Sequence, residues 1–186
     1  MKTIKEIFRS YAELNADGIH IGGSDRESNH RYGDAYESIF PDRRTVQSLL
    51  EIGVADGSSL LAWREVFPNA IITGMDIHPP ARICLDTERI FFLQGDQRSY
   101  ADCQLVGRYG FDVIIEDATH VLANTLLTLL YLWPAVKPGG VYIVEEWDGI
   151  GSLRDNVLSL FPNAMIVNTN GPFGGIESLV VFRKGQ

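Results

Sequence analysis

The sequence has little cysteine, no long apolar segment and no excess of positive charge. Its two cysteines, Cys84 and Cys103, are too few for a disulfide framework or for a zinc site with four cysteine ligands. The longest apolar stretches, such as 121–136, contain polar residues and fall short of the about 20 residues that a membrane-spanning helix needs. The first residues also lack the apolar region of a secretory signal. We therefore expect a cytoplasmic protein without a membrane partner.

The charge balance is acidic, with 24 Asp and Glu against 16 Lys and Arg, which gives a net charge of -8. Proteins that bind nucleic acid usually present a basic face, so we expect no nucleic-acid partner. A hydrophobic content of 45% is enough for a sizeable core, and 186 residues fit one domain. We expect a single domain over 1–186, in which an N-terminal helix and a covering segment (1–45) precede a catalytic core (46–186).

Short apolar runs alternate with helical patterns from residue 47 onwards. The predicted strands are 48–53, 70–75, 89–93, 111–115, 141–144, 164–167 and 178–182. Helical spacing predicts helices over 3–14, 34–40, 58–67, 119–133 and 153–161. This alternation predicts an α/β fold, a Rossmann-like doubly wound sheet of seven strands with helices on both faces. The sheet should be mainly parallel, with an antiparallel strand at the C-terminal edge, because a loop joins the last two runs.

Polar groups and glycines follow the first three core strands, at the sheet edge where α/β proteins bind ligands. Gly53 and Gly57 follow the first strand, where a ligand can approach the backbone and the N-terminus of the next helix. Asp76 ends the second strand, and an acid at this place can accept hydrogen bonds from a ribose. Asp96 and Gln97 follow the third strand and can read an adenine edge. Because the spacing is not G-x-G-x-x-G, an ordinary strand-to-helix turn is the alternative interpretation.

Acidic residues follow the next two strands. Asp117 ends the fourth strand, and Glu145 and Glu146 end the fifth. Clustered carboxylates repel one another unless a proton or a cation intervenes, and oxygen ligands favour magnesium, with manganese or calcium as competitors. His120 lies three residues after Asp117, and an ordinary histidine pKa of about 6.5 suits a general base. The alternative interpretation is a helix cap with solvated neighbours.

These residues together resemble the class I S-adenosylmethionine-dependent methyltransferases. The likeness is greatest to the metal-dependent sugar O-methyltransferases of the mycinamicin and macrocin type, with the cephalosporin-hydroxylase-like proteins as relatives. It covers about residues 18–184. LLEIGVADGSS resembles the first motif of the family, and DATH followed by VYIVEEW resembles its metal-and-base signature, with Glu146 where Asp is common. SDRESNHRYGDAYES resembles the segment before the first strand, with Arg26 where Lys is common.

The resemblance implies S-adenosylmethionine and magnesium as cofactors. It places Asp117, Glu145 and Glu146 at the metal and makes His120 the general base. Ser59 would hold the methionine carboxylate, and the segment that contains Tyr32 would fold over the cofactor. The full set of cofactor-binding residues that we predict is Glu51, Gly53, Gly57, Ser59, Asp76, Asp96, Gln97 and Tyr32.

The function expected from this resemblance is O-methylation of a hydroxyl on a small molecule or a sugar. Catechol-type enzymes place a Lys where His120 stands, which favours the sugar type and leaves the catechol or polyphenol type as an alternative. A nicotinamide-dependent oxidoreductase fits less well, because the third glycine and a Tyr-x-x-x-Lys pair are missing, and a non-catalytic cofactor-binding protein is a further alternative. Specificity would come from the loops 18–33 and 170–176 or from another subunit of a homo-oligomer.

Overall fold

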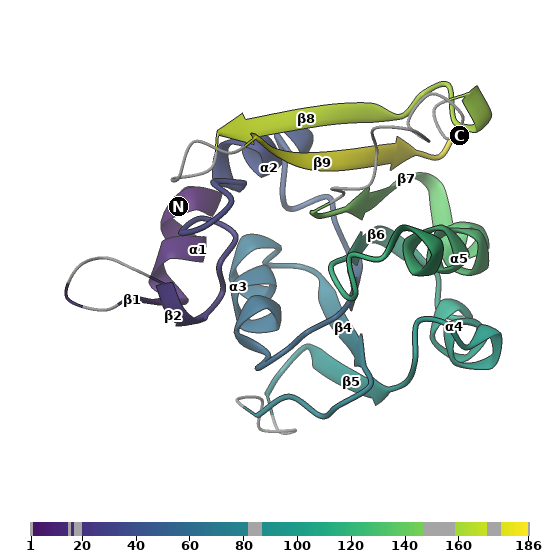
Figure 1. Cartoon of the computed structure of the whole chain (residues 1–186), viewed down its shortest axis with the longest axis horizontal. Coiled ribbons are helices and arrows are strands. Elements are labelled where there is room, and N and C mark those ends of the chain that lie inside the picture. Colours follow the sequence, from purple (N-terminus) through teal and green to yellow (C-terminus); the bar gives the residue numbers. More distant parts are fainter. Residues whose placement is uncertain are drawn as a thin grey trace.

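The computed structural model describes residues 2–14, 16, 20–81, 87–146, 159–170 and 176–185. A mixed sheet with helices on both faces forms the body of the molecule (Figure 1). Its strand order is β5-β4-β3-β6-β7-β9-β8. The strands are β3 (Ser48–Ile52), β4 (Ile71–Asp76), β5 (Ile90–Gln94), β6 (Phe111–Glu116), β7 (Val136–Val144), β8 (Met165–Asn170) and β9 (Ile176–Arg183). The predicted α/β fold with a seven-stranded sheet is therefore confirmed.

The sheet is parallel from β5 to β7 and antiparallel beyond. The antiparallel strand is β9, which pairs with β7 on one side and with β8 on the other, so β8 forms the edge. The order of the strands reverses between β3 and β6, because the chain moves outward from β3 to β5 and then returns to the other side of β3. Such a switch point leaves a crevice at the carboxyl ends of β3 and β6.

Two hydrophobic cores cover the two faces of the sheet. Helices α1 (Ile4–Ser10), α2 (Gly33–Ile39) and α3 (Ser58–Val66) pack on one face around Trp63, whose ring lies 4.9 Å from Phe8 and from Tyr36. Helices α4 (Tyr100–Gly107) and α5 (Leu122–Leu132) pack on the other face. The neighbours Leu49 and Leu50 of β3 are both fully buried, one in each core, as expected for a central strand covered on both sides. Among the described residues, no helix is long and apolar enough to cross a bilayer.

The structure corrects several predicted elements. Helix α1 begins with a capping box of Thr3 and Glu6 but ends at Ser10, and the last residues of the predicted helix form β1 (Ala12–Leu14). This strand pairs with β2 (His20–Gly23), which the sequence had placed in a loop. Helix α4 was not predicted, because it buries only Cys103 and Val106 and so has a weak helical pattern. The predicted helix 153–161 lies largely outside the described residues.

Candidate active site at the carboxyl ends of the strands

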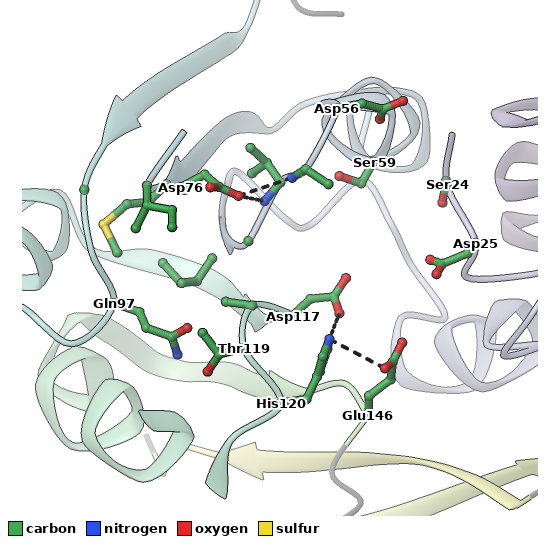
Figure 2. Close-up of a pocket in the computed structure, with 18 of the residues that line it drawn as sticks. Ser24, Asp25, Asp56, Ser59, Asp76, Gln97, Asp117, Thr119, His120 and Glu146 are labelled. Carbon is green, nitrogen blue, oxygen red and sulfur yellow. Dashed lines mark hydrogen bonds and ion pairs between the residues drawn. The ribbon is translucent and has the colours of Figure 1, made fainter. Parts of the chain in front are cut away.

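A cavity of about 490 Å³ opens at the carboxyl ends of β3, β4, β5 and β6 (Figure 2). Its volume is within the range of about 300–1,000 Å³ that is usual for small-molecule sites. One wall comes from the N-terminal part of the chain, through Gly23 and the residues that follow it. The predicted site residues that line the cavity are Gly53, Ser59, Asp76, Asp96, Gln97, Asp117, His120 and Glu146.

The turn between β3 and α3 depends on glycine. Gly53 has a φ of 85°, and a Cβ atom at this position would lie 2.3 Å from the carbonyl oxygen of Asp117. Gly57, with a φ of 89°, is the N-cap of α3 and does not line the cavity itself. The turn therefore contacts the end of β6 directly, and this contact leaves no room for a side chain at residue 53.

Asp76 holds the same turn from the side of β4. Its Oδ2 accepts hydrogen bonds from the backbone N–H groups of Val54 (2.9 Å) and Ala55 (3.2 Å), and its Oδ1 accepts one from His78 (3.0 Å). Figure 2 shows this carboxylate at the cavity wall. Asp76 thus fixes the turn and still presents oxygens with further lone pairs to a ligand.

The end of β5 contributes one partly exposed and one buried polar side chain. Asp96 receives a hydrogen bond of 2.6 Å from Arg98, which lowers the pKa of this carboxyl below its usual value. Gln97 is buried, and its amide nitrogen donates to Glu116 (3.0 Å) and Thr128 (2.9 Å). Its Oε1 has no hydrogen-bond partner among the described residues. The anchored amide therefore holds one buried acceptor that has no partner among these residues.

Glu51 lies behind the cavity wall and not in it, and its predicted place along the ligand stays a prediction. It is fully buried and accepts hydrogen bonds from Ser59 Oγ (2.8 Å) and Trp63 Nε1 (3.2 Å). Burial raises the pKa of its carboxyl, although the charge of Arg26 opposes this. Ser59 does line the cavity, so Glu51 acts on the site by orienting Ser59.

A buried arginine connects three strand ends. Arg26 Nη2 lies 2.6 Å from Glu51 Oε1 and 2.8 Å from Asp117 Oδ2, and its Nε lies 2.9 Å from Glu145 Oε1. The hydroxyl of Tyr36 also donates to Glu145. We call these residues the Arg26 cluster: Arg26, Tyr36, Glu51, Asp117 and Glu145.

The Arg26 cluster contains two of the three carboxylates that the sequence predicts as metal ligands, Asp117 and Glu145, and the role of Glu145 as a ligand stays a prediction. Glu145 is 2% exposed, does not line the cavity and is bound by Arg26 and Tyr36. Glu145 lies outside the cavity lining because it binds the guanidinium of Arg26, which lies between the ends of β3, β6 and β7. Arg26 itself was singled out by the sequence only as a departure from a common lysine. Its partners are 25, 91 and 119 residues away, so no local pattern reveals them.

A second group of side chains faces the cavity. Ligand atoms of Asp117, His120 and Glu146 lie within 4.8 Å of one another. His120 Nε2 is 3.9 Å from Asp117 Oδ1 and 3.5 Å from Glu146 Oε2 (Figure 2). We call these three residues the His120 group. Asp117 therefore belongs to both sets, because one of its oxygens faces Arg26 and the other faces His120.

The backbone is strained at both ends of the His120 group. His120 and Glu146 have φ values of 53° and 50°, in the left-handed region that residues other than glycine rarely adopt. Such a conformation costs on the order of 1–3 kcal/mol and persists only where the surroundings enforce it. Strain at two adjacent strand ends that face one cavity is typical of a functional site.

The donor set fits a divalent cation. Asp117 and Glu146 offer oxygens, and His120 offers a nitrogen. The Arg26 cluster contains three carboxylates and one guanidinium, so negative charge remains in excess beside the cavity. Burial, together with the charge of Glu145, raises the pKa of Asp117 well above its usual range. A cation at Asp117 would offset this excess charge.

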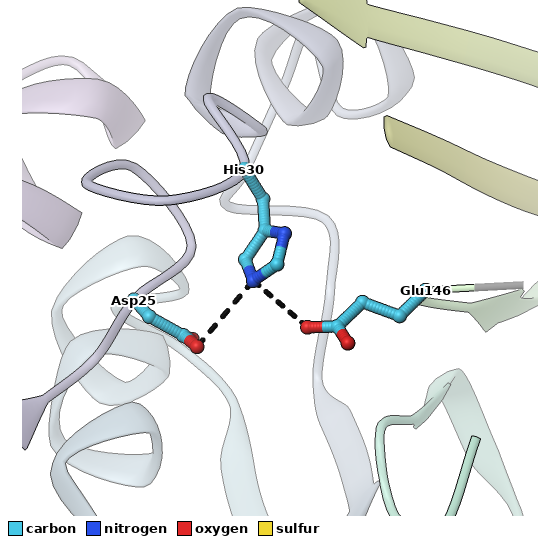
Figure 3. A group of neighbouring side chains, drawn as sticks. All are labelled: Asp25, His30 and Glu146. Carbon is cyan, nitrogen blue, oxygen red and sulfur yellow. Dashed lines mark hydrogen bonds and ion pairs between the residues drawn. The ribbon is translucent and has the colours of Figure 1, made fainter. Parts of the chain in front are cut away.

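The loop formed by residues 24–32, the 24–32 loop, lies over the same strand ends. His30 Nε2 is 2.8 Å from Glu146 Oε1 and 3.4 Å from Asp25 Oδ2 (Figure 3). Burial alone would lower the pKa of His30, but the hydrogen bonds to Asp25 and Glu146 outweigh it and raise this pKa to about 11. Tyr32 is fully buried, and its hydroxyl accepts the N–H of Glu146 at 3.4 Å. Tyr32 does not line the cavity, and its contact with a ligand stays a prediction.

The loop itself does line the cavity, through Ser24, Asp25 and Arg26. The sequence had singled out this segment by resemblance but gave no role to Asp25. The other loop expected to matter, 170–176, lies largely outside the described residues.

No family model matches the chain. It is 35% identical over 142 residues to mycinamicin VI 2''-O-methyltransferase of Micromonospora griseorubida, which covers 68% of this chain and 35% of that protein. It is 33% identical over 168 residues to 8-demethyl-8-alpha-L-rhamnosyl tetracenomycin-C 2'-O-methyltransferase of Streptomyces olivaceus, which covers 85% of this chain and 42% of that protein. The chain thus spans less than half the length of these curated relatives.

Solved structures show the same fold. The MycE methyltransferase of the mycinamycin biosynthetic pathway, in complex with Mg, SAH and mycinamycin VI, aligns with a TM-score of 0.77 at 24% identity, over 100% of this chain and 55% of that chain. The same methyltransferase in complex with Mg and SAH aligns with a TM-score of 0.74 at 26% identity, over 100% of this chain and 55% of that chain.

Proposed function

We propose that this chain, which is related to the S-adenosylmethionine-dependent O-methyltransferases of macrolide sugars, transfers a methyl group to a hydroxyl of a small-molecule glycoside. The observation that carries the proposal is a single cavity that contains the Gly53 turn, Asp76 and the His120 group. The relatives are named as O-methyltransferases, one of them acting on a rhamnosyl tetracenomycin. MycE has been solved with SAH and Mg, which supports the same two cofactors here.

The cavity offers a place for each part of S-adenosylmethionine. Asp76 would bind the ribose, Asp96 and Gln97 would lie at the adenine, and Gly53 with Ser59 would border the methionine end. When bound, S-adenosylmethionine supplies a methyl group on a sulfonium, which an acceptor oxygen attacks in line with the departing sulfur. Holding both reactants in this geometry is worth several kcal/mol in such transfers, about 7–11 kcal/mol at most.

Asp117 and Glu146 would hold the divalent ion, magnesium in the first place and manganese or calcium as alternatives. The ion supplies positive charge that makes an acceptor hydroxyl easier to deprotonate. Glu145, the third ligand that the sequence predicts, would act through the Arg26 cluster by holding Arg26 against Asp117.

His120 would accept the proton of the acceptor hydroxyl at Nε2. This nitrogen faces Asp117 Oδ1 and Glu146 Oε2, so the proton would rest opposite two carboxylates. The side chain of His120 is 36% exposed, which lets an acceptor reach the ring. A positioned base of this kind contributes about 10²–10⁴-fold to a rate.

Calorimetry on the full chain tests the cofactor. We expect S-adenosylmethionine and its demethylated product to bind with micromolar affinity and the nicotinamide dinucleotides not to bind. If neither methyl-donor form binds at high micromolar concentration, the proposal is wrong. Binding of a nicotinamide dinucleotide in their place would support the oxidoreductase alternative.

A substitution of His120 tests the base. His120→Ala should reduce methyl transfer to a glycoside acceptor by about 10²–10⁴-fold and leave the Kd of S-adenosylmethionine within about twofold. His78→Ala is the matched control, because His78 is exposed and does not line the cavity. If a chelator and His120→Ala both leave the rate unchanged, the metal-and-base mechanism is wrong even for a working methyltransferase.

A further inference from the structure

We infer that His30 is a positioning residue for the cation site, and that the placement of the 24–32 loop is thermodynamically coupled to cation binding. This inference rests on the proposed function, since it concerns Glu146 as a ligand of the ion. It assigns a role to a histidine that lies outside the cavity lining.

The two oxygens of Glu146 face two different histidines. Oε1 lies 2.8 Å from His30 Nε2, and Oε2 lies 3.5 Å from His120 Nε2. The hydrogen bond to His30 (Figure 3) therefore fixes the rotation of the carboxylate about its last bond. It leaves the other oxygen on the side of Asp117 and His120 (Figure 2). Groups that hold a metal ligand in this way tune metal affinity nearly as strongly as the ligands do.

His30 is itself held from several sides. Asp25 Oδ2 lies 3.4 Å from its Nε2, and the ring of Tyr32 stacks on its ring with centroids 5.2 Å apart. The backbone carbonyl of His30 accepts a hydrogen bond of 2.6 Å from Thr169 Oγ1 on β8. Its side chain is only 12% exposed. A side chain held in this way can position its partner at a small further cost in entropy.

The loop also holds the strained backbone of Glu146. This residue has a φ of 50°, and its N–H donates to the hydroxyl of Tyr32, which belongs to the same loop. The loop therefore holds both the main chain and the side chain of Glu146. Without the loop in place, nothing else described here binds Glu146 Oε1, and the residue is free to relax from its strained conformation.

Coupling of this kind is reciprocal. If the placed loop favours the ion, the bound ion favours the placed loop by the same free energy. Cation binding should therefore slow hydrogen exchange in the 24–32 loop, although the loop is not expected to supply a direct ligand.

Manganese titration of the full chain, without S-adenosylmethionine, tests the inference. We expect His30→Ala to weaken Mn²⁺ binding by about 10–100-fold, the range found when a partner of a metal ligand is removed. His30→Gln should recover most of the affinity, because its amide can donate from near the position of Nε2. Asn29→Ala, a partly buried neighbour in the same loop, should stay within about twofold of wild type. Mn²⁺ should slow exchange in the loop of the wild type more than in His30→Ala.

The outcomes separate the inference from the proposed function. A wild type that binds no Mn²⁺ overturns the inference and the proposed metal site but not the proposed methyl transfer, which binding of S-adenosylmethionine tests. A wild type and a folded His30→Ala with equal affinity overturn only the positioning role. If the wild type binds two Mn²⁺ ions and His30→Ala binds one, then Asp25, His30 and Glu146 form a second metal site. This result would also overturn the positioning role. If His30→Ala does not fold, Tyr32→Phe provides the same comparison, because it removes only the hydroxyl at the N–H of Glu146. An unchanged Mn²⁺ affinity in Tyr32→Phe would then overturn the inference.

Discussion

The Arg26 cluster and the His120 group share Asp117 but differ in burial. The side chains of Arg26, Glu51 and Glu145 expose 3%, 0% and 2% of their surface, whereas those of His120 and Glu146 expose 36% and 25%. In the buried set the chain supplies its own cation, a guanidinium with hydrogen bonds to three carboxylates. In the open set the carboxylates face a cavity and a histidine.

The difference separates two tasks that the same residue types can perform. A buried charge is tolerated only when it is paired, so removal of one partner destabilises the fold. A half-exposed carboxylate can remain charged without a fixed partner and is available to a ligand. The adjacent residues Glu145 and Glu146 illustrate the contrast, since one is bound by Arg26 and the other faces the His120 group.

The largest expected effect is the loss of Arg26. Arg26→Ala leaves the carboxylates of Glu51, Asp117 and Glu145 without their buried cation, and we expect the free energy of unfolding to fall by about 3–5 kcal/mol. Urea denaturation measures this. The control is Lys2→Ala, which removes an exposed ion pair with Glu65 and should cost less than about 1 kcal/mol. Equal losses in the two variants would show that the Arg26 cluster is not the stabilising set.

Substitution of the two adjacent glutamates tests the contrast directly. Glu145→Gln removes a charged acceptor of Arg26 and Tyr36 and should lower the free energy of unfolding by about 2 kcal/mol, with little change in Mn²⁺ affinity. Glu146→Gln keeps an oxygen that can accept a hydrogen bond from His30, and it should weaken Mn²⁺ binding at least about tenfold. Denaturation and calorimetry on both variants give the result. The reverse pattern would restore Glu145 as the ligand that the sequence predicts.

The smallest effect concerns a buried carboxylate with exposed cations. Glu27 is buried, while its partners Lys5 and Arg9 expose 33% and 65% of their side chains, and burial raises its pKa above 4.5. The folded state then binds more protons than the unfolded state above about pH 4.5, so this contribution to stability falls as the pH rises. Denaturation measured at several values from about pH 4 to pH 7 tests this. The free energy of unfolding of the wild type should fall by up to about 1 kcal/mol relative to that of Glu27→Gln as the pH rises. If the difference in the free energy of unfolding between the two proteins does not change with pH, the charge of Glu27 is compensated by its partners, as the charges of the Arg26 cluster are.

The sequence predicts the sheet well because its strands are buried on both faces and read as apolar runs. The errors lie where long-range pairing decides the structure. β1 exists only because β2 pairs with it. β7 begins at Val136 because Val136 pairs with Phe111, and the turn-like residues 137–140 form a register irregularity before the pairing resumes at Val141. Helix α4 lacks a clear apolar stripe.

The sequence predicts those residues of the candidate site that directly follow a strand. Asp76, Asp117 and His120 follow their strands, and the crevice of the sheet brings them together. The sequence could not separate Glu145 from Glu146, because successive side chains of an extended chain point in opposite directions and only the third dimension shows which one meets Arg26. The buried arginine binds both Glu145 and Glu51 and accounts for the place of Glu51 behind the wall.

The left-handed backbone at His120 has a consequence for laboratory evolution. Asparagine tolerates this conformation better than most residues do, and glycine adopts it without strain. A library selected only for resistance to heat would therefore be enriched in asparagine or glycine at residue 120, and these heat-resistant clones would have lost the proposed base. Selection for thermal stability and selection for catalytic activity thus favour different amino acids at position 120.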